Sequence, residues 1–251
     1  MSRLLIRYDE APARRILALS DTEDMRAQRR RVLDVGCGPG HLATELAAAV
    51  GPNGRVCGVD VSEHMLALAA QPEVQFVHVR GTALPFAEGE FDAAVATQVY
   101  EFVEDLAAAL AELWRVLRTG GRVLILDTDW DTLVWHSSDS ARMRRVLDGW
   151  RRRVAHPHLP RTLARELREA GFEVDHVHTY AIFDTLGSEG SYSALQIEHL
   201  GASAEGVAAD EVAAWTADLR DLAAAGEYFF SLNRYVFSAR KPEAGRGAGS
   251  S

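Results

Sequence analysis

Cysteine is scarce in this chain, which carries Cys37 and Cys57 among its 251 residues. Two cysteines are too few for a disulfide framework, and their separation is not that of a zinc-ligand pair. We therefore expect both thiols to be reduced, as in a cytoplasmic protein, and predict no metal site. Cys37 stands between two glycines and is interpreted as a small residue tolerated there, not as a nucleophile.

Long apolar runs and a surplus of positive charge are also missing. No stretch approaches the roughly 20 apolar residues that a membrane-spanning helix needs, so we expect no membrane insertion. The opening residues, MSRLLIRYDEAPARR, lack the apolar core of a secretion signal, which again favours the cytoplasm. With 36 acidic and 27 basic side chains the formal net charge is -9, and such a chain repels a phosphate backbone. Nucleic acid is therefore a poor candidate partner.

Short apolar strands and helical patterns alternate along the first half of the chain. The predicted strands cover residues 32–35, 55–61, 74–79, 91–97 and 122–127. This alternation predicts an α/β fold with a doubly wound parallel sheet, because right-handed crossovers leave few other topologies. Ligands of such sheets bind beyond the carboxyl ends of the strands, so the residues directly after each strand are the candidates for a site.

The second half is less regular. Helices are expected at 139–155 and 161–170, and strands at 172–183 and 228–239. The segment 187–226 between these two strands carries helical patterns at 191–200 and 208–225. Residues 241–251 are rich in Gly, Ser and Ala without an apolar pattern, and we expect a disordered tail.

The strongest signal is the run Asp34-Val35-Gly36-Cys37-Gly38-Pro39-Gly40 between a strand and a helix. Glycines let the chain turn tightly and let a ligand lie against bare backbone. A dinucleotide-binding loop has the spacing G-x-G-x-x-G, whereas this loop reads G-x-G-x-G and follows an acidic residue. A pyrophosphate disfavours a nearby carboxylate, so this loop suits a ligand with an ammonium or sulfonium group.

The segment VLDVGCGPG resembles the first motif of the class I S-adenosylmethionine-dependent methyltransferases, in particular the small-molecule branch (methyltransferase type 11) that includes ubiquinone and menaquinone C-methyltransferases. LWRVLRTGGRVLI is also similar to that family, and the resemblance covers residues 30–128 most strongly. It implies a Rossmann-like, doubly wound seven-stranded sheet, mostly parallel with an antiparallel last strand and a helical insertion between the last two strands. It also implies one domain over 1–240, with a helical lid at 1–30, a cofactor-binding core at 31–128 and a substrate-side half at 129–240.

The resemblance implies S-adenosylmethionine as cofactor and S-adenosylhomocysteine as product. Asp60 ends the second strand, where an acid can accept hydrogen bonds from ribose hydroxyls. Thr82 replaces the acid that usually contacts the adenine amine, and a purely structural turn residue is an open alternative, as a core position is for Met65. The predicted cofactor residues are Asp34, Gly36, Cys37, Gly38, Gly40, Asp60, Val61, Met65, Thr82, Ala83 and Gln98.

Catalytic and substrate residues are expected near the ends of the fourth and fifth strands. Histidine is the side chain best suited to act as a base near neutral pH, so His136 is a candidate base, and Asp129 is a candidate to orient it or to bind a cationic acceptor. Aromatic residues there could form a wall for a flat substrate, with core packing as the alternative. The predicted substrate residues are Tyr8, Tyr100, Trp130, Trp135, His158 and Asn233.

The leading hypothesis is methyl transfer to a C-, O- or N-acceptor of a small metabolite by a cytoplasmic enzyme, with a homodimer left open. An alternative is a regulatory module of the same fold that binds the cofactor without transfer. The glycine spacing disfavours a nicotinamide oxidoreductase. The net charge and the lack of an Asn/Asp-Pro-Pro-aromatic sequence after the fourth strand disfavour a nucleic-acid methyltransferase.

Overall fold

The structure is a computed structural model that describes residues 30–69 and 71–243. The first half contains β1 (Arg31–Val35), α3 (His41–Val50), β2 (Arg55–Asp60), α4 (Glu63–Ala67), β3 (Val74–His78), β4 (Phe91–Thr97), η1 (Tyr100–Phe102), α5 (Leu106–Val116) and β5 (Leu117–Thr128). The second half contains η2 (Trp130–Thr132), β6 (Val134–Trp135), α6 (Ser140–Arg151), η3 (Leu159–Arg161), α7 (Leu163–Glu169), β7 (Glu173–Asp184), α8 (Tyr192–Ser203), α9 (Ala209–Ala225) and β8 (Phe230–Arg240).

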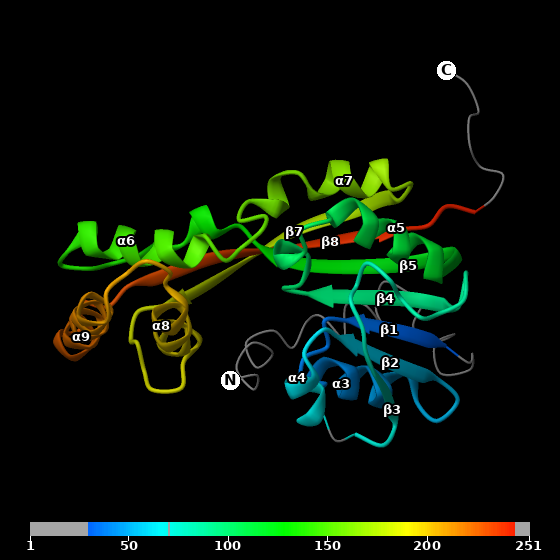
Figure 1. The fold of residues 1–251 in the computed structure, drawn as a ribbon, viewed down its shortest axis with the longest axis horizontal. Coiled ribbons are helices and arrows are strands. Elements are labelled where there is room, and N and C mark those ends of the chain that lie inside the picture. Colours follow the sequence, from blue (N-terminus) through cyan, green and yellow to red (C-terminus); the bar gives the residue numbers. More distant parts are fainter. Residues whose placement is uncertain (1–29, 70, 244–251) are drawn as a thin grey trace.

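The strands form one eight-stranded sheet with the order β3-β2-β1-β4-β5-β8 (Figure 1). β7 pairs along one edge of β8, and the two-residue β6 pairs with the other edge, beyond the end of β5. Strands β1 to β5 are parallel, and β8 is antiparallel to β5. The predicted Rossmann-like sheet with an antiparallel last strand is therefore confirmed, and β6 adds an eighth strand to the seven predicted.

Helices cover both faces of the sheet because each presents one apolar stripe to it. Leu110 and Leu113 of α5 pack with α7 residues on one face, and Leu42 and Leu46 of α3 are buried on the other. The α5 helix begins where the Asp105 side chain accepts a hydrogen bond from the backbone of the first turn. The crossovers therefore leave the carboxyl ends of the parallel strands at one edge.

A second apolar core lies away from this sheet centre. β7 and β8 run past the other strands, and α6, α8 and α9 gather around their far part (Figure 1). Trp150, Trp215 and Phe230 are buried in this core, which is separate from the clusters beneath α5 and α3. We call the helices α6, α8 and α9 with β6 the distal lobe. The predicted helical insertion between the last two strands is confirmed by α8 and α9.

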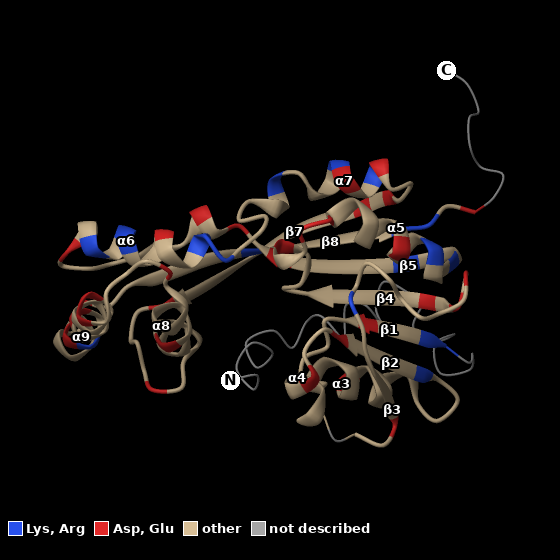
Figure 2. Ribbon diagram, in the orientation of Figure 1, with Lys and Arg blue, Asp and Glu red and all other residues tan. Residues whose placement is uncertain are grey.

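Charged side chains of both signs lie along α6, α7 and α9, whereas the strands are largely uncharged between their ends (Figure 2). Within the described residues, none of the helices combines the length and the apolar content needed to cross a membrane. Residues 1–29 and 244–251 lie outside the described residues, so the predicted lid and tail, and with them the proposed division into parts, stay predictions.

Candidate cofactor cleft

A cleft of about 640 Å³ opens where strands β1 to β4 end. This is the edge at which open α/β sheets bind ligands. The lining residues are Val35, Gly36, Val59, Asp60, Val61, Val79, Arg80, Gly81, Thr82, Gln98, Val99, Tyr100, Phe102, Val103, Glu104 and Asp105. Five predicted cofactor residues are therefore in the lining, namely Gly36, Asp60, Val61, Thr82 and Gln98.

The glycine loop after β1 follows a path that a side chain would obstruct. Gly36, Gly38 and Gly40 have φ angles of 67°, 53° and 79°, in the left-handed region that favours glycine. A Cβ atom at Gly36 would lie 2.3 Å from Cγ2 of Val99. The loop thus packs against the segment after β4, and its bare backbone at Gly36 faces the cleft.

Asp60 joins the end of β2 to this loop. Its Oδ2 accepts a hydrogen bond from the Gly38 N–H at 2.8 Å, and its Oδ1 accepts one from the Ser62 N–H at 2.8 Å. A carboxylate has about four acceptor sites, so both oxygens can still receive a hydroxyl donor from the cleft side. The residue is therefore held in place by backbone donors while it lines the cavity.

Asp34 lies behind the loop and is 2% exposed. Its Oδ2 has no hydrogen-bond partner within the described residues. Burial, with a smaller contribution from the Asp60 charge, raises the pKa of Asp34 to about 8. A buried carboxyl with a free oxygen is stabilised in its ionised form by a nearby cation, which fits a ligand with a positive group in the loop.

The remaining predicted cofactor residues are not part of the cleft lining. Cys37 is buried under the loop, and burial first, then the charges of Asp34 and Asp60, raises the pKa of its thiol, which agrees with a non-reactive role. Met65 is partly exposed on α4, and Ala83 is exposed after β3. Their contacts with a cofactor stay predictions.

Gln98 directly follows β4 and anchors a polar network. Of its members, the sequence predicted Gln98 alone. Its side-chain amide donates to Thr128 Oγ1 at 2.8 Å, and its Oε1 accepts from Nη2 of Arg234 at 2.6 Å. Arg234 also donates to the Tyr192 hydroxyl at 3.0 Å. A signal for Arg234 existed: it interrupts the alternation of buried apolar residues Phe230, Leu232 and Val236 along β8.

Two buried carboxyls, Glu101 and Asp127, accompany this network. Glu101 Oε2 accepts hydrogen bonds from the Trp130 indole at 3.0 Å and from the Thr128 N–H at 3.3 Å. Burial raises the pKa of Glu101 to about 7 and raises that of Asp127 well above its usual range. Asp127 Oδ1 accepts from the Val99 N–H at 3.1 Å. These carboxyls therefore hold the segments after β4 and β5 together.

The predicted catalytic pair, His136 and Asp129, is not brought together. Both oxygens of Asp129 accept hydrogen bonds from Arg161, at 2.7 Å from Nε and 3.0 Å from Nη2. Burial alone would raise the pKa of Asp129, but these bonds outweigh it and lower the pKa. His136 is exposed after β6, where its backbone N–H donates to the Phe229 carbonyl. The idea that Asp129 orients His136 is not supported by this geometry.

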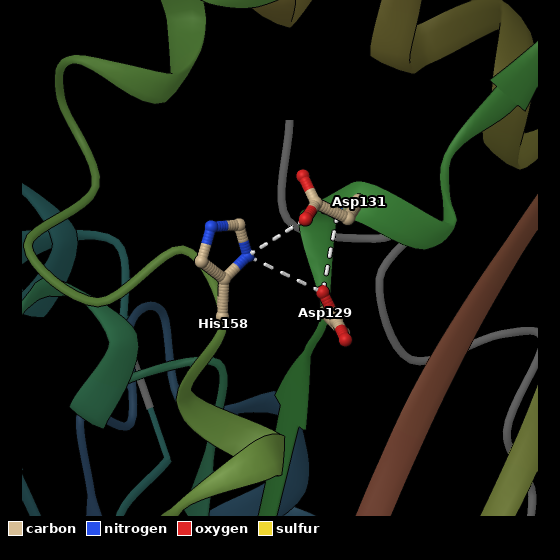
Figure 3. A group of neighbouring side chains, drawn as sticks. All are labelled: Asp129, Asp131 and His158. Atoms are coloured by element: carbon tan, nitrogen blue, oxygen red, sulfur yellow. Dashed lines mark hydrogen bonds and ion pairs between the residues drawn. The ribbon is translucent and has the colours of Figure 1, made fainter.

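Asp129 lies instead beside Asp131 and His158 (Figure 3). The ring Nδ1 of His158 is 3.5 Å from Asp129 Oδ1 and 3.4 Å from Asp131 Oδ2. Arg161 donates to both carboxylates, including Asp131 Oδ2 at 2.8 Å. Two carboxylates and an imidazole could hold a metal ion, but the Arg161 guanidinium already supplies the positive charge. We interpret the group as an ion-pair cluster at the base of the distal lobe.

The predicted aromatic wall is divided between two places. Tyr100 lines the cleft, whereas Trp130 and Trp135 are buried in the core of the distal lobe. The rings of Trp135 and Phe230 are 4.9 Å apart, which is the packing expected of core residues. Asn233 is half-buried on β8, and its backbone N–H donates to Thr132 Oγ1. The prediction for Tyr8 falls outside the described residues.

Comparisons with known proteins agree with this geometry. Residues 33–125 match the family described as a methyltransferase domain. An uncharacterised 37.1 kDa protein from a Streptomyces fradiae transposon is 40% identical over 151 residues, which are 57% of this chain and 43% of that protein. Demethylmenaquinone methyltransferase of Lactococcus lactis is 37% identical over 109 residues, 41% of this chain and 43% of that protein. The matches thus span less than half the length of these curated relatives.

Solved structures share the fold at low sequence identity. A putative methyltransferase from Bacillus halodurans has a TM-score of 0.61 at 18% identity, covering 92% of this chain and 99% of that one. The [4+2]-cyclase SpnF has a TM-score of 0.56 at 23% identity, covering 92% and 81%. A phosphoethanolamine N-methyltransferase from Haemonchus contortus, solved with S-adenosyl-L-methionine, has a TM-score of 0.54 at 21% identity, covering 92% and 53%.

Proposed function

We propose that this chain, whose residues 33–125 form a class I S-adenosylmethionine-dependent methyltransferase domain, transfers the methyl group of that cofactor to a small molecule. The resemblance predicted from the glycine motif is confirmed by the family match. The main support for the proposal is the composition of one cleft. The glycine loop, Asp60 and the segment after β4 line this cleft together at the carboxyl edge of the sheet.

The residues of the cleft fit the parts of this cofactor. Asp60 has acceptor sites left for the ribose hydroxyls, and Val61 and Thr82 offer one apolar and one polar surface for the adenine. The backbone at Gly36 and the buried carboxyl of Asp34 fit the methionine end, which carries an ammonium group. When bound, the cofactor supplies a methyl group already activated by the sulfonium, so the protein mainly provides proximity and alignment.

Apolar residues follow β4 in the cleft lining, namely Tyr100, Phe102 and Val103, and two acidic residues, Glu104 and Asp105, come after them. Phe102 is 43% exposed. An exposed aromatic side chain beside a ligand cavity favours an apolar or aromatic acceptor. The acid–base roles of His136 and Asp129, the homodimer and the cytoplasmic location stay predictions.

A second candidate is a protein of the same fold that binds the cofactor without transferring its methyl group. It is favoured by the position of His136, which is exposed outside the cleft lining. The SpnF structure shows that a protein of this fold can be a cyclase. Since fold does not determine function, turnover has to be measured.

The deciding experiment supplies the protein with S-adenosylmethionine labelled in its methyl group and with a fractionated small-molecule extract. We expect label in an organic-soluble product, and about tenfold less or lower still in a parallel reaction with the Asp60→Ala variant at a cofactor concentration below saturation. Binding of S-adenosylhomocysteine without label in any fraction would favour the binding protein. Absence of S-adenosylhomocysteine binding would reject both candidates.

A further inference from the structure

Gln98 adopts a backbone conformation that residues with side chains rarely adopt. Its φ is 54°, and within residues 30–69 and 71–243 it alone among the non-glycine residues has a positive φ. Such a conformation costs free energy and persists where surrounding contacts enforce it, most often at functional sites. Gln98 also lines the cleft, so its conformation shapes the cavity.

Contacts of the side-chain amide and of the backbone of Gln98 enforce this conformation. The amide nitrogen donates to Thr128 Oγ1 at 2.8 Å, and the amide oxygen accepts from Nη2 of Arg234 at 2.6 Å. The backbone N–H of Gln98 donates to the Leu126 carbonyl at 2.7 Å. The residue is therefore held by two neighbouring strands, β5 and β8.

Arg234 is itself held in an unusual place for a cation. It is 2% exposed and stands in the apolar alternation of β8. Its guanidinium lies 4.8 Å from the ring centroid of Tyr192 and donates to that hydroxyl at 3.0 Å. Its charge also acts on the buried carboxyl of Glu101. A buried charge is costly unless it is bonded and compensated, so Arg234 has a defined geometry.

The turn at Gln98 determines where the next residue packs. The Val99 N–H donates to Asp127 Oδ1 at 3.1 Å, which directs the chain across the end of β5. The Val99 side chain then lies against Gly36, where a Cβ atom would be 2.3 Å from its Cγ2. A continuous series of contacts therefore leads from Tyr192 in the distal lobe through Arg234, Gln98 and Val99 to the glycine loop.

We infer that Arg234 is a positioning residue that holds Gln98 in its left-handed conformation and so keeps the cofactor cleft in its binding-competent shape. The inference rests on the proposed function, because it names S-adenosylmethionine as the ligand of the cleft. Without Arg234, Gln98 relaxes to an ordinary conformation, and only a fraction of the molecules keep the competent shape. The apparent affinity falls by that fraction.

Isothermal titration with S-adenosylhomocysteine tests the inference. We expect Arg234→Met to bind about tenfold more weakly than wild type, as when a tenth of the molecules are competent. Tyr192→Phe removes one bond of Arg234 and should show a smaller loss in the same direction. Arg240→Met is the matched control, because Arg240 lies exposed on the same strand and pairs with Glu173. It should bind as wild type does.

A double-mutant cycle separates positioning from general destabilisation. In a Gln98→Gly background the residue adopts a positive φ unaided and the partner of Arg234 is gone. Arg234→Met should then change the affinity by less than about twofold, because the two substitutions remove one contact. If thermal denaturation shows that Arg234→Met is not folded, Arg234→Gln replaces it, because the neutral and shorter glutamine side chain does not extend to the position from which Nη2 donates to Gln98 and Tyr192.

The outcomes distinguish the inference from the proposed function. If wild type does not bind S-adenosylhomocysteine, the proposed function fails. If wild type binds, but Arg234→Met binds equally well or loses the same factor in both backgrounds, Arg234 does not act through Gln98 and the inference is wrong.

Discussion

The Oδ2 atom of Asp60 accepts a hydrogen bond from the backbone N–H of Gly38 across 2.8 Å, which joins the end of β2 to the glycine loop. The same carboxylate lines the cleft. We therefore propose two roles for Asp60. It holds the glycine loop through the Gly38 N–H, and its carboxylate accepts hydrogen bonds from the ribose hydroxyls of the cofactor. Substitution of this one residue should affect the ligand more than the fold.

The first prediction concerns Asp60→Ala. Loss of hydrogen bonds to a charged acceptor should weaken S-adenosylhomocysteine binding about tenfold to a hundredfold, measured by isothermal titration. Glu63→Ala is the control, because the Glu63 side chain is 82% exposed on the neighbouring helix and should not affect affinity. Unchanged affinity in a folded Asp60→Ala protein would remove Asp60 from the cofactor site.

The second prediction compares two glycines of one loop. Both have positive φ angles, but a Cβ atom at Gly36 would meet Val99, whereas one at Gly38 would have nothing within 4 Å. We expect Gly38→Ala to cost about 1 kcal/mol from backbone strain and Gly36→Ala about 3 kcal/mol, because overpacking is added. Urea denaturation measures both. Adding Val99→Ala should recover part of the Gly36→Ala loss, and equal losses for the two glycines would contradict the packing.

The third prediction follows from the pKa of Asp34, which burial raises from 3.8 to about 8. Between these values the folded protein keeps a proton that the unfolded chain releases, so the free energy of unfolding falls as the pH rises. At roughly 1.4 kcal/mol for each pKa unit, the loss from pH 4 to pH 8 is on the order of a few kcal/mol.

Asp34→Asn removes this titration while it keeps the shape of the protonated acid. Urea denaturation at pH 5 and pH 8 should therefore show a smaller fall in stability for the variant than for wild type. An equal fall in both proteins would mean that Asp34 does not carry a raised pKa.

The fourth prediction concerns the predicted base, His136. A general base has to reach the proton that it removes, and His136 is exposed outside the cleft lining. We expect His136→Ala to keep the initial rate of methyl transfer within about threefold of wild type. A loss of about 10²- to 10⁴-fold, with the affinity for the cofactor unchanged, would instead establish His136 as the base.

The sequence allowed the sheet and part of the cleft to be predicted because both depend on local signals. Apolar runs of strand length, separated by helical patterns and glycines, identify strands whose carboxyl ends meet at one edge. Gly36, Asp60, Thr82 and Gln98 each lie within a few residues of such an end, and all four line the cleft.

Contacts between distant segments could not be predicted in this way. Arg161 lies 32 residues after Asp129 and donates hydrogen bonds to both of its carboxylate oxygens. The acidic run around Asp129 does not indicate this partner. Arg234 is 136 residues from Gln98. The twelve-residue β7 extends with β8 beyond the sheet centre, which places Trp135 in a second core and His136 away from the cleft. These contacts and positions depend on the three-dimensional path of the strands, which the local sequence does not specify.

The most direct measurement is isothermal titration of the wild-type protein with S-adenosylhomocysteine, with NADH titrated in parallel. We expect one molecule bound per chain with a dissociation constant in the micromolar range, and no heat of binding for NADH. If the folded protein does not bind S-adenosylhomocysteine, or binds NADH saturably in its place, the cleft is not a site for S-adenosylmethionine.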